Sequence, residues 1–567
     1  MNEKKTELKK RGTAQTIEEL AQERGHWDDS PAAFDFKNSL ELIENAMKNG
    51  SSVTIIGDYD CDGVCASSII YLTLLRLGTK ARIRLPLRFA EGYGMNTIMV
   101  DEIESGLVIT VDNGITALEA AKAAKEKGLT LLITDHHLPQ TDGEGLLLPE
   151  ADCLIDPHVE EILGQPGYDF AGYCGAGIAL KLAEQLLKNA GDTDELFLDK
   201  LYAFAAMATV ADVMDLVADN RTICRRGFTA MVSGRVTAGT KTLLEQCSLS
   251  FEPKLPTNAK PWMLLTGENV SFKLAPGINA PSRLSEHEGD GGFKFVKEGG
   301  DGAKISLMCL LTDDAMRAER YASALKKFNF DRKTISNAEY DKAKAAIIAL
   351  GMENDSPMLV EADGAPHGIA GILAGKLCEE YGVPVIVLTG NAEDEIRHGS
   401  CRSPDGCNIR EMLDSVADLL VTYGGHSGAA GLSLRKENIA ACRERLQAVC
   451  GGFRKEKENA IEYDLELSVS DVNHVLHVLE TELAPFGQGN TDPVFLLRDV
   501  TVNDIRMLGG KHVKLNVDGL EAIGFGMADE DFAGQLSRGS TVSLVGRLGY
   551  NYYRGKATPQ FQVEEVL

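Results

Sequence analysis

Three short apolar runs of the chain each end in acidic or histidine residues, and helical patterns separate the runs. Residues 53–57, 107–111 and 129–134 have the length and the β-branched content of buried strands. The segments 67–77 and 117–127 between them have the apolar spacing of helices. Strands that alternate with helices form βαβ units, so the sequence predicts a doubly wound α/β domain with a parallel sheet.

The first of these runs is followed by three closely spaced carboxylates. Asp58, Asp60 and Asp62 would point the same way if the strand continued, and Gly63 would then let the chain turn tightly. Carboxylates this close repel one another unless cations lie among them, and hard oxygen ligands favour Mg²⁺ or Mn²⁺ over softer metals. The segment therefore predicts a divalent metal site, with an acidic surface turn as the alternative.

The other two runs are also followed by side chains that can bind a metal ion. Asp112 follows the second run, and Asp135, His136 and His137 follow the third. The carboxyl ends of parallel strands meet at one edge of a sheet, where ligands bind, so we expect these side chains to converge with the acids of the first run. An isolated histidine pair is commonly structural. Only the expected position of this pair beside the acids favours a functional interpretation.

A fourth contribution comes from an apolar helical stretch, residues 203–210, which leads into Asp212 and Asp215. Either acid can join the cluster. Taken singly, Asp212 would more often cap a helix or lie in a solvated turn.

The overall charge restricts how the chain can meet a polyanion. Its 58 Lys and Arg residues stand against 84 Asp and Glu residues, a formal net charge of -26, so any contact with nucleic acid must be local. The twelve cysteines include no CxxC pair, and Cys61 lies inside the acidic motif, which favours a reduced cytosolic setting. The basic amino-terminal segment lacks an apolar core and no apolar run approaches bilayer length, so we expect no signal peptide and no membrane anchor.

Motifs along nearly the whole chain resemble those of one family. The segments GDYDCDG, TVDNG, TDHH and ATVADVMDL resemble the successive motifs of the DHH phosphoesterase superfamily. Within it the chain is similar to the RecJ type of single-strand-specific 5′ to 3′ exonuclease, through residues 86–88, 91–94 and 278–280 and through Arg283. Residues 399–403 and 424–431 resemble the associated DHHA1 domain.

The resemblance implies a set of metal ligands. Two divalent cations, Mn²⁺ or Mg²⁺, would be surrounded by Asp58, Asp60, Asp62, Asp112, His136 and Asp212. Asp112 and Asp212 are the natural bridging ligands, His137 would contact the scissile phosphate, and Asp135 would orient a neighbouring group. Two such ions can activate a water and stabilise the leaving oxygen of an in-line displacement.

The expected architecture is α/β and multidomain. We expect an N-terminal helical segment (1–48), a DHH catalytic domain with a parallel sheet (49–312) and an inserted loop near 287–304, a connecting helix (313–350), an α/β DHHA1 domain (351–455) and a C-terminal OB-fold β-barrel that binds nucleic acid (456–567). Basic residues of the connecting helix can line a cleft for a phosphate backbone, although a solvated face with neighbouring acids such as Glu319 is the commoner outcome.

The second lobe carries residues suited to an anion. The sequence predicts helices over 369–380 and 408–420 and a strand over 385–388. Gly425 and His426 belong to a predicted turn whose backbone N–H groups can cradle an anion, with packing glycines as the alternative. The resemblance implies that this lobe holds the terminal 5′ phosphate. The candidates for binding phosphate or DNA here and in the RecJ-like segments are Arg88, Arg283, Arg402, Ser403, Gly425 and His426.

The chain departs from the family pattern at three places. Asp156 precedes a Pro-His pair where an asparagine is expected, which is a mild change. Gly277 stands where an arginine is usual, which removes a cation, and Pro281-Ser282 replaces the small Ala-Gly pair before Arg283. The family pattern therefore supports a substrate contact near Arg283 less well than it supports the metal site.

The last hundred or so residues change to short β-rich segments. Strands are predicted over 495–506, 512–517, 522–525, 540–548 and 560–566, with a helix over 529–536 between the third and fourth, an order that resembles an OB-fold. Tyr552 or Tyr553 with Arg554, in the predicted loop 551–555, are candidates for stacking against unpaired bases. An ordinary hairpin tip is the alternative, since packing uses the same residue types.

These features together predict an enzyme of nucleic-acid metabolism. The resemblance implies hydrolysis of single-stranded DNA from its 5′ end to 5′ mononucleotides, in recombination and repair in the cytoplasm, with single-strand-binding protein and a RecQ-type helicase as partners. A nanoRNase-like phosphodiesterase acting on short oligonucleotides would use the same metals but would not need the C-terminal β domain. A non-catalytic single-strand-binding scaffold would have lost metal ligands that are all present here.

Overall fold

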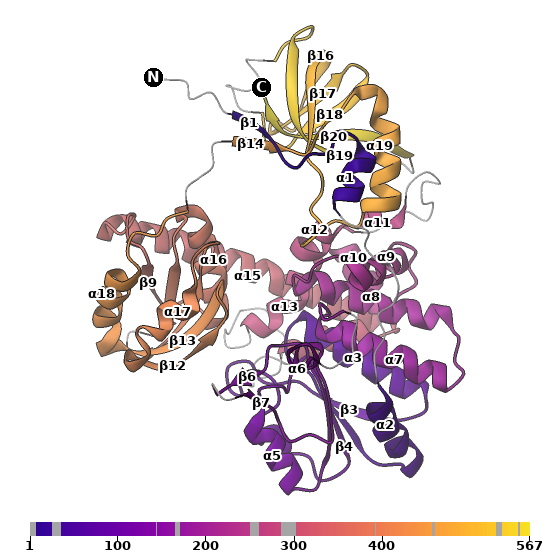
Figure 1. The fold of residues 1–567 in the computed structure, drawn as a ribbon, viewed down its shortest axis with the longest axis vertical. Coiled ribbons are helices and arrows are strands. Elements are labelled where there is room, and N and C mark those ends of the chain that lie inside the picture. Colours follow the sequence, from indigo (N-terminus) through magenta and orange to yellow (C-terminus); the bar gives the residue numbers. More distant parts are fainter. Residues whose placement is uncertain are drawn as a thin grey trace.

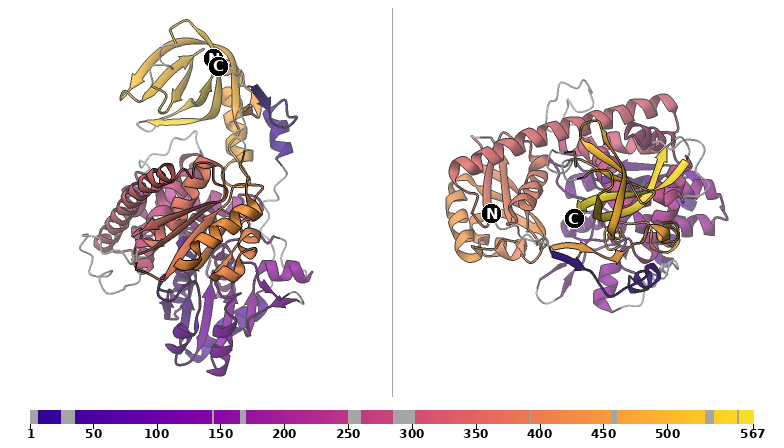
Figure 2. Two further views of the ribbon diagram at one scale, coloured as in Figure 1. Left: turned by 90° about the vertical axis from the view of Figure 1, so that its left-hand side faces the viewer. Right: turned by 90° about the horizontal axis from the view of Figure 1, so that it is seen from above.

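The chain folds into three lobes (Figure 1). The computed structural model describes residues 7–24, 36–142, 145–164, 170–249, 260–284, 302–391, 393–455, 460–528, 536–553 and 556–567. The first lobe is joined to the second by the long helix α15 (Ala315–Leu350), and the third, β-rich lobe stands on the helical part of the first (Figures 1 and 2). None of the helices in the described residues combines the length and the apolarity needed to span a lipid bilayer.

The first lobe contains a five-stranded parallel sheet. Its strands, in spatial order, are β3 (Ala81–Arg84), β2 (Val53–Ile56), β4 (Leu107–Val111), β5 (Thr130–Thr134) and β8 (Cys153–Ile155). The three strands expected from the sequence are therefore confirmed, as is the doubly wound α/β class. The strand order reverses between β2 and β4, and in sheets of this type ligands bind outside the carboxyl ends of the strands at that reversal.

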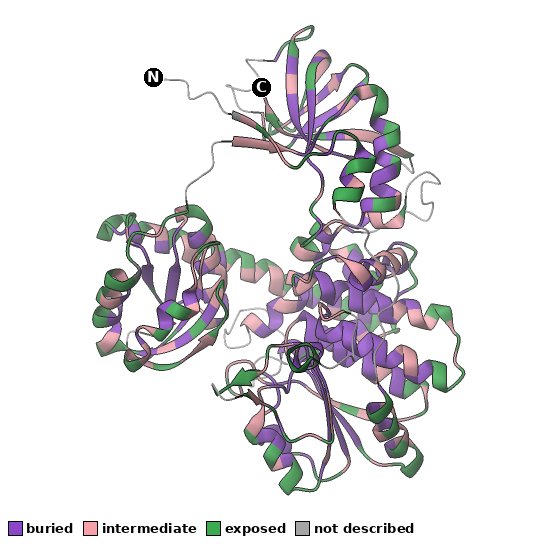
Figure 3. Ribbon diagram, viewed as in Figure 1, coloured by how far each residue is buried: buried purple, intermediate pink, exposed green. Residues whose placement is uncertain are grey.

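Helices cover both faces of this sheet and continue into a helical layer. Around the sheet lie α2 (Lys37–Asn49), α3 (Cys61–Arg76), α4 (Thr97–Asp101), α5 (Leu118–Glu126) and α6 (Pro157–Leu163), with a small hairpin of β6 (Gln140–Thr141) and β7 (Leu146–Leu147). The layer consists of α7 (Gly175–Asn189), α8 (Glu195–Ala211), α9 (Ala218–Val232), α10 (Ala238–Gln246), α11 (Pro261–Leu264), α12 (Gly267–Asn269), the π-helical turn η1 (Val270–Leu274), α13 (Ala275–Leu284) and α14 (Gly302–Leu311). Helices α3, α7 and α8 are buried along most of their length and form the centre of the largest hydrophobic core (Figure 3). The inserted loop expected near 287–304 falls largely outside the described residues.

The second lobe is a smaller α/β unit. Its sheet has the order β12 (Leu420–Gly425), β13 (Ala429–Arg435), β11 (Ile396–Arg402), β10 (Val385–Gly390) and β9 (Met358–Asp363), in which only β9 and β10 run parallel. Helices α16 (Ala370–Tyr381), α17 (Ile409–Asp414) and α18 (Ile439–Cys450) and the short turns η2 (His367–Ile369), η3 (Ala417–Leu419) and η4 (Lys436–Asn438) complete it. The helix expected over 408–420 ends at Asp414, because Val416 leaves helical geometry (φ -122°) to reach the core.

The third lobe has the strand pairing of an OB-fold. Strands β16 (Phe495–Leu508), β17 (His512–Val517), β18 (Leu520–Gly524), β20 (Lys556–Val566) and β19 (Thr541–Tyr553) pair in that order, and β19 pairs back to β16, so the five strands form a ring. Before them come β14 (Ala460–Tyr463), β15 (Leu465–Glu466), η5 (Val469–Asp471), α19 (Val472–Val478) and η6 (Leu479–Leu483). All five expected strands are present, whereas the helix expected over 529–536 falls almost wholly outside the described residues.

The amino-terminal segment is divided between two lobes. Strand β1 (Glu7–Lys10) pairs with β14, and α1 (Ile17–Glu23) packs against the core of the third lobe. Helix α2 packs instead against the core of the first lobe. The segment expected as one helical unit (1–48) therefore contributes to two lobes, the third through β1 and α1 and the first through α2.

Candidate active site

The acids after β2 lie in a turn and a helix rather than along a continued strand. Strand β2 ends at Ile56 and α3 begins at Cys61, so the alternation expected for these acids does not occur. Asp60 caps the helix, its Oδ1 accepting the backbone N–H groups of Asp62 (3.0 Å) and Gly63 (3.1 Å). Gly63 lies in the first turn of α3, where a Cβ would overlap the backbone of Asp58. The glycine therefore permits a close approach of two backbone segments and does not make the tight turn expected for it.

The structure brings all six expected ligands together at the carboxyl edge of the sheet. Three groups have ligand atoms within 4.8 Å of one another: Asp58, Asp60 and Asp112; Asp62, His136 and Asp212; and Asp112, His136 and His137. The Nε2 atom of His136 lies 3.1 Å from Asp112 and 3.6 Å from both Asp62 and Asp212. Asp112 and His136 each belong to two groups, so they occupy the middle of the cluster.

Asp62 and Asp112 are positioned by the amino end of α7. Both carboxylate oxygens of Asp62 accept backbone N–H groups there, from Gly175 and Ala176, each at 2.7 Å. The partial positive charge of a helix amino end favours a carboxylate in that place. A Cβ on Gly175 would overlap the Cβ of Asp112, so glycine is required for α7 to come this close.

His137 is held by two neighbours beside the cluster. Its Nδ1 lies 2.8 Å from Asp135 and 3.0 Å from the hydroxyl oxygen of Tyr93, whose proton is donated to the backbone carbonyl of Asp112 (2.7 Å). Asp135 in turn accepts the backbone N–H groups of His136 and Ile115. Burial would lower the pKa of His137, but the hydrogen bond and charge of Asp135 outweigh it and raise that pKa to about 9. The ring is therefore protonated at neutral pH and suited to an anionic group.

The carboxylates of the cluster fit divalent cations. Burial and the charge of Asp60 raise the pKa of Asp58 well above its ordinary value, and burial with four neighbouring acids does the same for Asp112. Burial and the charges of Asp62 and Asp60 raise the pKa of Asp212 to about 8. Buried acids that repel one another in this way are stabilised as carboxylates by cations among them, and oxygen and imidazole ligands suit Mn²⁺ and Mg²⁺.

Four arginines gather next to this centre, where the first lobe meets the second. Burial, followed by the charges of Arg88, Arg332 and Arg402, lowers the pKa of Arg283 to about 10. Burial also lowers the pKa of Arg332 and of Arg402. The guanidinium of Arg88 lies over the ring of Tyr59, 4.7 Å from its centroid. Guanidinium groups placed together in a partly buried position form a site for a phosphate.

Ser400 stands beside Arg402 in this arginine cluster. A Cβ built on Gly371 of α16 would lie 3.0 Å from the hydroxyl of Ser400 and 3.1 Å from the guanidinium of Arg402, so the two side chains share one face of β11. The predicted partner Ser403 instead donates its hydroxyl to the carbonyl of Cys407 (2.8 Å) and stabilises a turn. Alternation along a strand puts residues two apart on the same side, and this rule would have selected Ser400 from the sequence.

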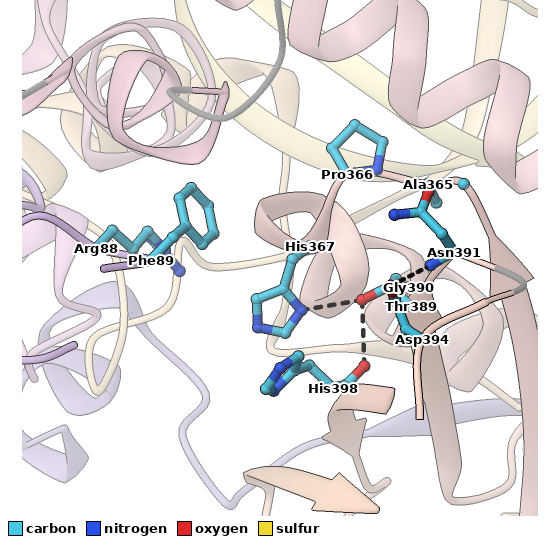
Figure 4. Close-up of a pocket in the computed structure, with 11 residues that line it drawn as sticks. Arg88, Phe89, Ala365, Pro366, His367, Thr389, Gly390, Asn391, Asp394 and His398 are labelled. Carbon is cyan, nitrogen blue, oxygen red and sulfur yellow. Dashed lines mark hydrogen bonds between the residues drawn. The ribbon is translucent and has the colours of Figure 1, made fainter. Parts of the chain in front are cut away.

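A cavity of about 470 Å³ opens between the same two lobes (Figure 4). Arg88 and Phe89 face His367 and His398 across it. The Nδ1 of His367 lies 2.9 Å from the hydroxyl of Thr389, which donates to the carbonyl of His398 (3.1 Å). Burial, His398 and Arg88 lower the pKa of His367 to about 4, so its ring is neutral.

Other predicted residues lie apart from the acidic centre. Gly425 ends the edge strand β12 and pairs with Ala430, so the expected turn begins only at the exposed His426. In the described part of the chain, no hydrogen bond or ion pair joins His426 to the acidic cluster. Tyr552 lies on β19 rather than in a loop, and its hydroxyl is buried with no partner among the described residues. The side chain of Tyr553 and the whole of Arg554 fall outside the described residues.

Comparison with known proteins assigns the three lobes to three domain families. Residues 52–209 match the DHH family, N-terminal domain, residues 355–452 match the DHHA1 domain and residues 463–565 match the RecJ OB domain. The chain is built from a DHH domain, a DHHA1 domain and a RecJ OB domain, in that order. The expectation drawn from its motifs is thereby confirmed.

Curated relatives match the chain over nearly its whole length. It is 30% identical to the single-stranded-DNA-specific exonuclease RecJ of Bacillus subtilis (strain 168), over 94% of this chain and 63% of that protein. It is 28% identical to the protein of the same name from Salmonella typhimurium, over 93% of this chain and 89% of that one. The crystal structure of RecJ in complex with Mn²⁺ from Thermus thermophilus superimposes with a TM-score of 0.73 at 25% identity, covering 95% of this chain and 73% of that one. The chain thus spans less than two thirds of the Bacillus protein.

Proposed function

We propose that this chain is a single-strand-specific exonuclease that hydrolyses DNA from its 5′ end and releases 5′ mononucleotides. The observation that carries the proposal is the adjacency of the acidic centre and the arginine cluster in a chain of the RecJ type. The acids suit cations that act on a phosphodiester, and the neighbouring arginines suit a terminal phosphate of the same strand. Its named relatives are exonucleases specific for single-stranded DNA.

The cofactors are two divalent cations, Mn²⁺ or Mg²⁺, held by Asp58, Asp60, Asp62, Asp112, His136 and Asp212. When bound, they supply an activated water and charge stabilisation for an in-line displacement. Asp112 belongs to two of the three ligand groups, so it would serve as a ligand in either of them. The Thermus relative has been crystallised with Mn²⁺.

The surrounding side chains hold the substrate. Protonated His137, fixed by Asp135, donates to an oxygen of the scissile phosphate, and Tyr93 keeps the ring in place. Arg402, Arg283 and Ser400 bind the 5′ phosphate. With its 5′ phosphate held between two lobes, the strand presents its first phosphodiester to the acids, and this fixes the direction of degradation.

We extend the proposal to the setting of the enzyme. The DHH domain would span residues 49–312, the connecting helix 313–350, the DHHA1 domain 351–455 and the OB domain 456–567. Residues 7–24 of the amino-terminal segment would belong to the OB domain, and α2 to the DHH domain. The resemblance supports a cytoplasmic role in recombination and repair, in which a RecQ-type helicase exposes the strand and single-strand-binding protein covers it.

The test is product analysis on three substrates. A 5′-labelled single strand, a 3′-labelled copy and the matching blunt duplex are each incubated with Mn²⁺, Mg²⁺ or a chelator. We expect labelled 5′ mononucleotide from the first single strand alone, and only with metal. An Asp112→Ala variant with an unchanged circular dichroism spectrum should lose at least about a thousand-fold in rate. Cleavage of dinucleotides with inert long strands would overturn the proposal in favour of a short-oligonucleotide phosphodiesterase, and no turnover would favour a binding scaffold.

A further inference from the structure

Two backbone segments of the helical layer hold ligands of the acidic centre. The amino end of α7 donates two backbone N–H groups to the carboxylate of Asp62. Asp212 ends α8 and begins the segment 212–217, which leads into α9. Asp62 and Asp212 belong to the same ligand group, together with His136. The distance between the two segments therefore sets the width of that group.

The side chain of Asn220 joins these two segments. It lies in the first turn of α9, is fully buried, and donates its amide N–H groups to two backbone carbonyls. One carbonyl is that of Gly172 (2.6 Å), which lies three residues before Gly175. The other is that of Asp215 (3.1 Å), which lies three residues after Asp212. One amide group thus ties the backbone that holds Asp62 to the backbone that carries the other ligand.

The neighbouring Asp219 holds α7 a second time. Its carboxylate accepts the hydroxyl proton of Tyr173 (2.6 Å) and lies 2.5 Å from the ammonium group of Lys181 on α7. All three side chains are buried, so these charge-assisted contacts are strong and costly to break. Because Tyr173 stands two residues before Gly175, they fix the start of α7, which is the part that holds Asp62.

The segment between Asp212 and α9 carries backbone strain. Val213 (φ 58°) and Ala218 (φ 45°) have left-handed backbones, which are rare for residues other than glycine and costly for a β-branched side chain. Positions of this kind persist only where surrounding contacts hold them. The hydrogen bond from Asn220 to the carbonyl of Asp215 is one such contact. Without it the segment would relax, and Asp212 would move with it.

We propose that Asn220 and Asp219 are positioning residues of the metal centre, which keep the ligand group of Asp62, His136 and Asp212 at the separation that a divalent cation requires. This inference rests on the proposed function, in which that group holds one of two cations. In the described part of the chain, neither side chain has a hydrogen bond or ion pair to a ligand of the cluster. Both act through the backbone of the segments that they join (Figure 1).

The ligand group of Asp58, Asp60 and Asp112 provides an internal reference. Asp60 caps α3, and Asp58 accepts the backbone N–H of Gly94 at 3.4 Å. These contacts belong to the turn between β2 and α3 and do not involve α9. A loss confined to one of the two cations is therefore the result that distinguishes positioning from a general defect of the fold.

The experiment is a titration with Mn²⁺ alone, in which electron paramagnetic resonance separates free from bound ions. The full chain is used as wild type and as Asn220→Ala, Tyr173→Phe and Tyr202→Phe variants. Tyr202 is a matched control, because it is a buried tyrosine that also donates to a carboxylate at 2.6 Å, that of Glu184, farther along α7. Urea unfolding reports the stability of each variant. The kcat and KM on a 5′-phosphorylated single strand are measured at several Mn²⁺ concentrations.

We expect wild type to bind two Mn²⁺ ions, and Asn220→Ala to bind one of them at least about ten-fold more weakly, the lower limit for losing a residue that orients a metal ligand. Tyr173→Phe should change in the same direction, and Tyr202→Phe should not change. In Asn220→Ala, kcat should fall at low Mn²⁺ and recover at high Mn²⁺ with KM for DNA unchanged, which a loss of stability alone would not produce.

Unchanged Mn²⁺ binding in Asn220→Ala and Tyr173→Phe would overturn the inference, as would equal weakening of both ions or an equal effect of Tyr202→Phe. If Asn220→Ala does not fold, the comparison of the two tyrosine variants decides. If wild type binds two ions and Asn220→Ala weakens one of them, but wild type releases no nucleotide, the positioning roles stand and the exonuclease proposal fails.

Discussion

Replacing Asp156 by asparagine should make the protein more stable at neutral pH. Asp156 follows β8 and is fully buried. Its Oδ1 accepts the backbone N–H of His158 (2.9 Å), whereas Oδ2 has no partner among the described residues. Burial and the charge of Asp135 raise the pKa of Asp156 to about 8. An asparagine would fill the same space without a charge and would offer an N–H in place of the unpaired oxygen.

The size of the effect follows from the difference in proton binding. An aspartate in the unfolded chain has a pKa of about 4, so between pH 4 and pH 8 only the folded protein holds this proton. The contribution of Asp156 to the free energy of unfolding therefore falls by about 1.4 kcal/mol for each pH unit in that window and is level above pH 8. Between pH 5 and pH 8 the advantage of Asp156→Asn over wild type should grow by about 4 kcal/mol.

The assay is urea unfolding of both proteins at several pH values between 5 and 8, followed by circular dichroism in chelator. Titrating groups that do not interact with Asp156 cancel in the difference between the two proteins, so the slope of that difference reports Asp156 and its charged neighbours Asp135 and His137. The exposed Asp341, changed to asparagine, is the control for the chemical change itself. A difference for Asp156→Asn that stays constant within about 1 kcal/mol would show that the carboxylate is charged in the folded protein and would refute the argument.

Three further changes test the geometry of the site. Gly175→Ala should reduce metal-dependent activity at least about ten-fold with the circular dichroism spectrum unchanged, because its Cβ would displace Asp112; normal activity would show that the contact yields. Gly277→Ala should raise the free energy of unfolding by about 0.5 to 1 kcal/mol in urea titration, since a Cβ there meets no atom within 4 Å and glycine is a poor helix former; a loss of stability would contradict this. Asp135→Asn removes the partner that holds the pKa of His137 at about 9, so activity should begin to fall at a lower pH in a pH–rate profile, and an unshifted profile would remove His137 from the proposed role.

Features set by neighbouring residues were predictable from the sequence, and features set by contacts between lobes were not. The acids converge because parallel strands share a carboxyl edge, a rule that needs only the strands and their order along the chain. Strand β17 was located to the residue, as a short β-rich segment. The position of Asp62 in a helix was missed, because apolar runs alone do not show where α3 begins.

The arginine cluster shows the limit of this approach. In the sequence Arg332 is one of several basic residues on the connecting helix, yet it lies beside Arg283 because α15 packs against α13 of the first lobe. A Cβ on Gly368 would overlap the backbone of Arg283, so a close contact between lobes fixes this arrangement. Such contacts depend on how the lobes are placed, which no local pattern encodes. Tyr552 was misplaced for a related reason, since the hairpin of β19 and β20 extends farther than its apolar pattern.

The distribution of charge is compatible with the proposed action of so acidic a chain on a polyanion. Two divalent cations would nearly cancel the charge of the five carboxylates of the centre. With the cations bound, the centre would therefore repel DNA little. The four arginines supply positive charge at one point, which is the proposed position of a terminal phosphate. The remaining acids, which give the chain its net charge of -26, disfavour contact along the length of a strand or duplex. Attraction confined to an end, with repulsion elsewhere, selects for a free 5′ terminus over internal sites, and this is the selectivity that an exonuclease requires.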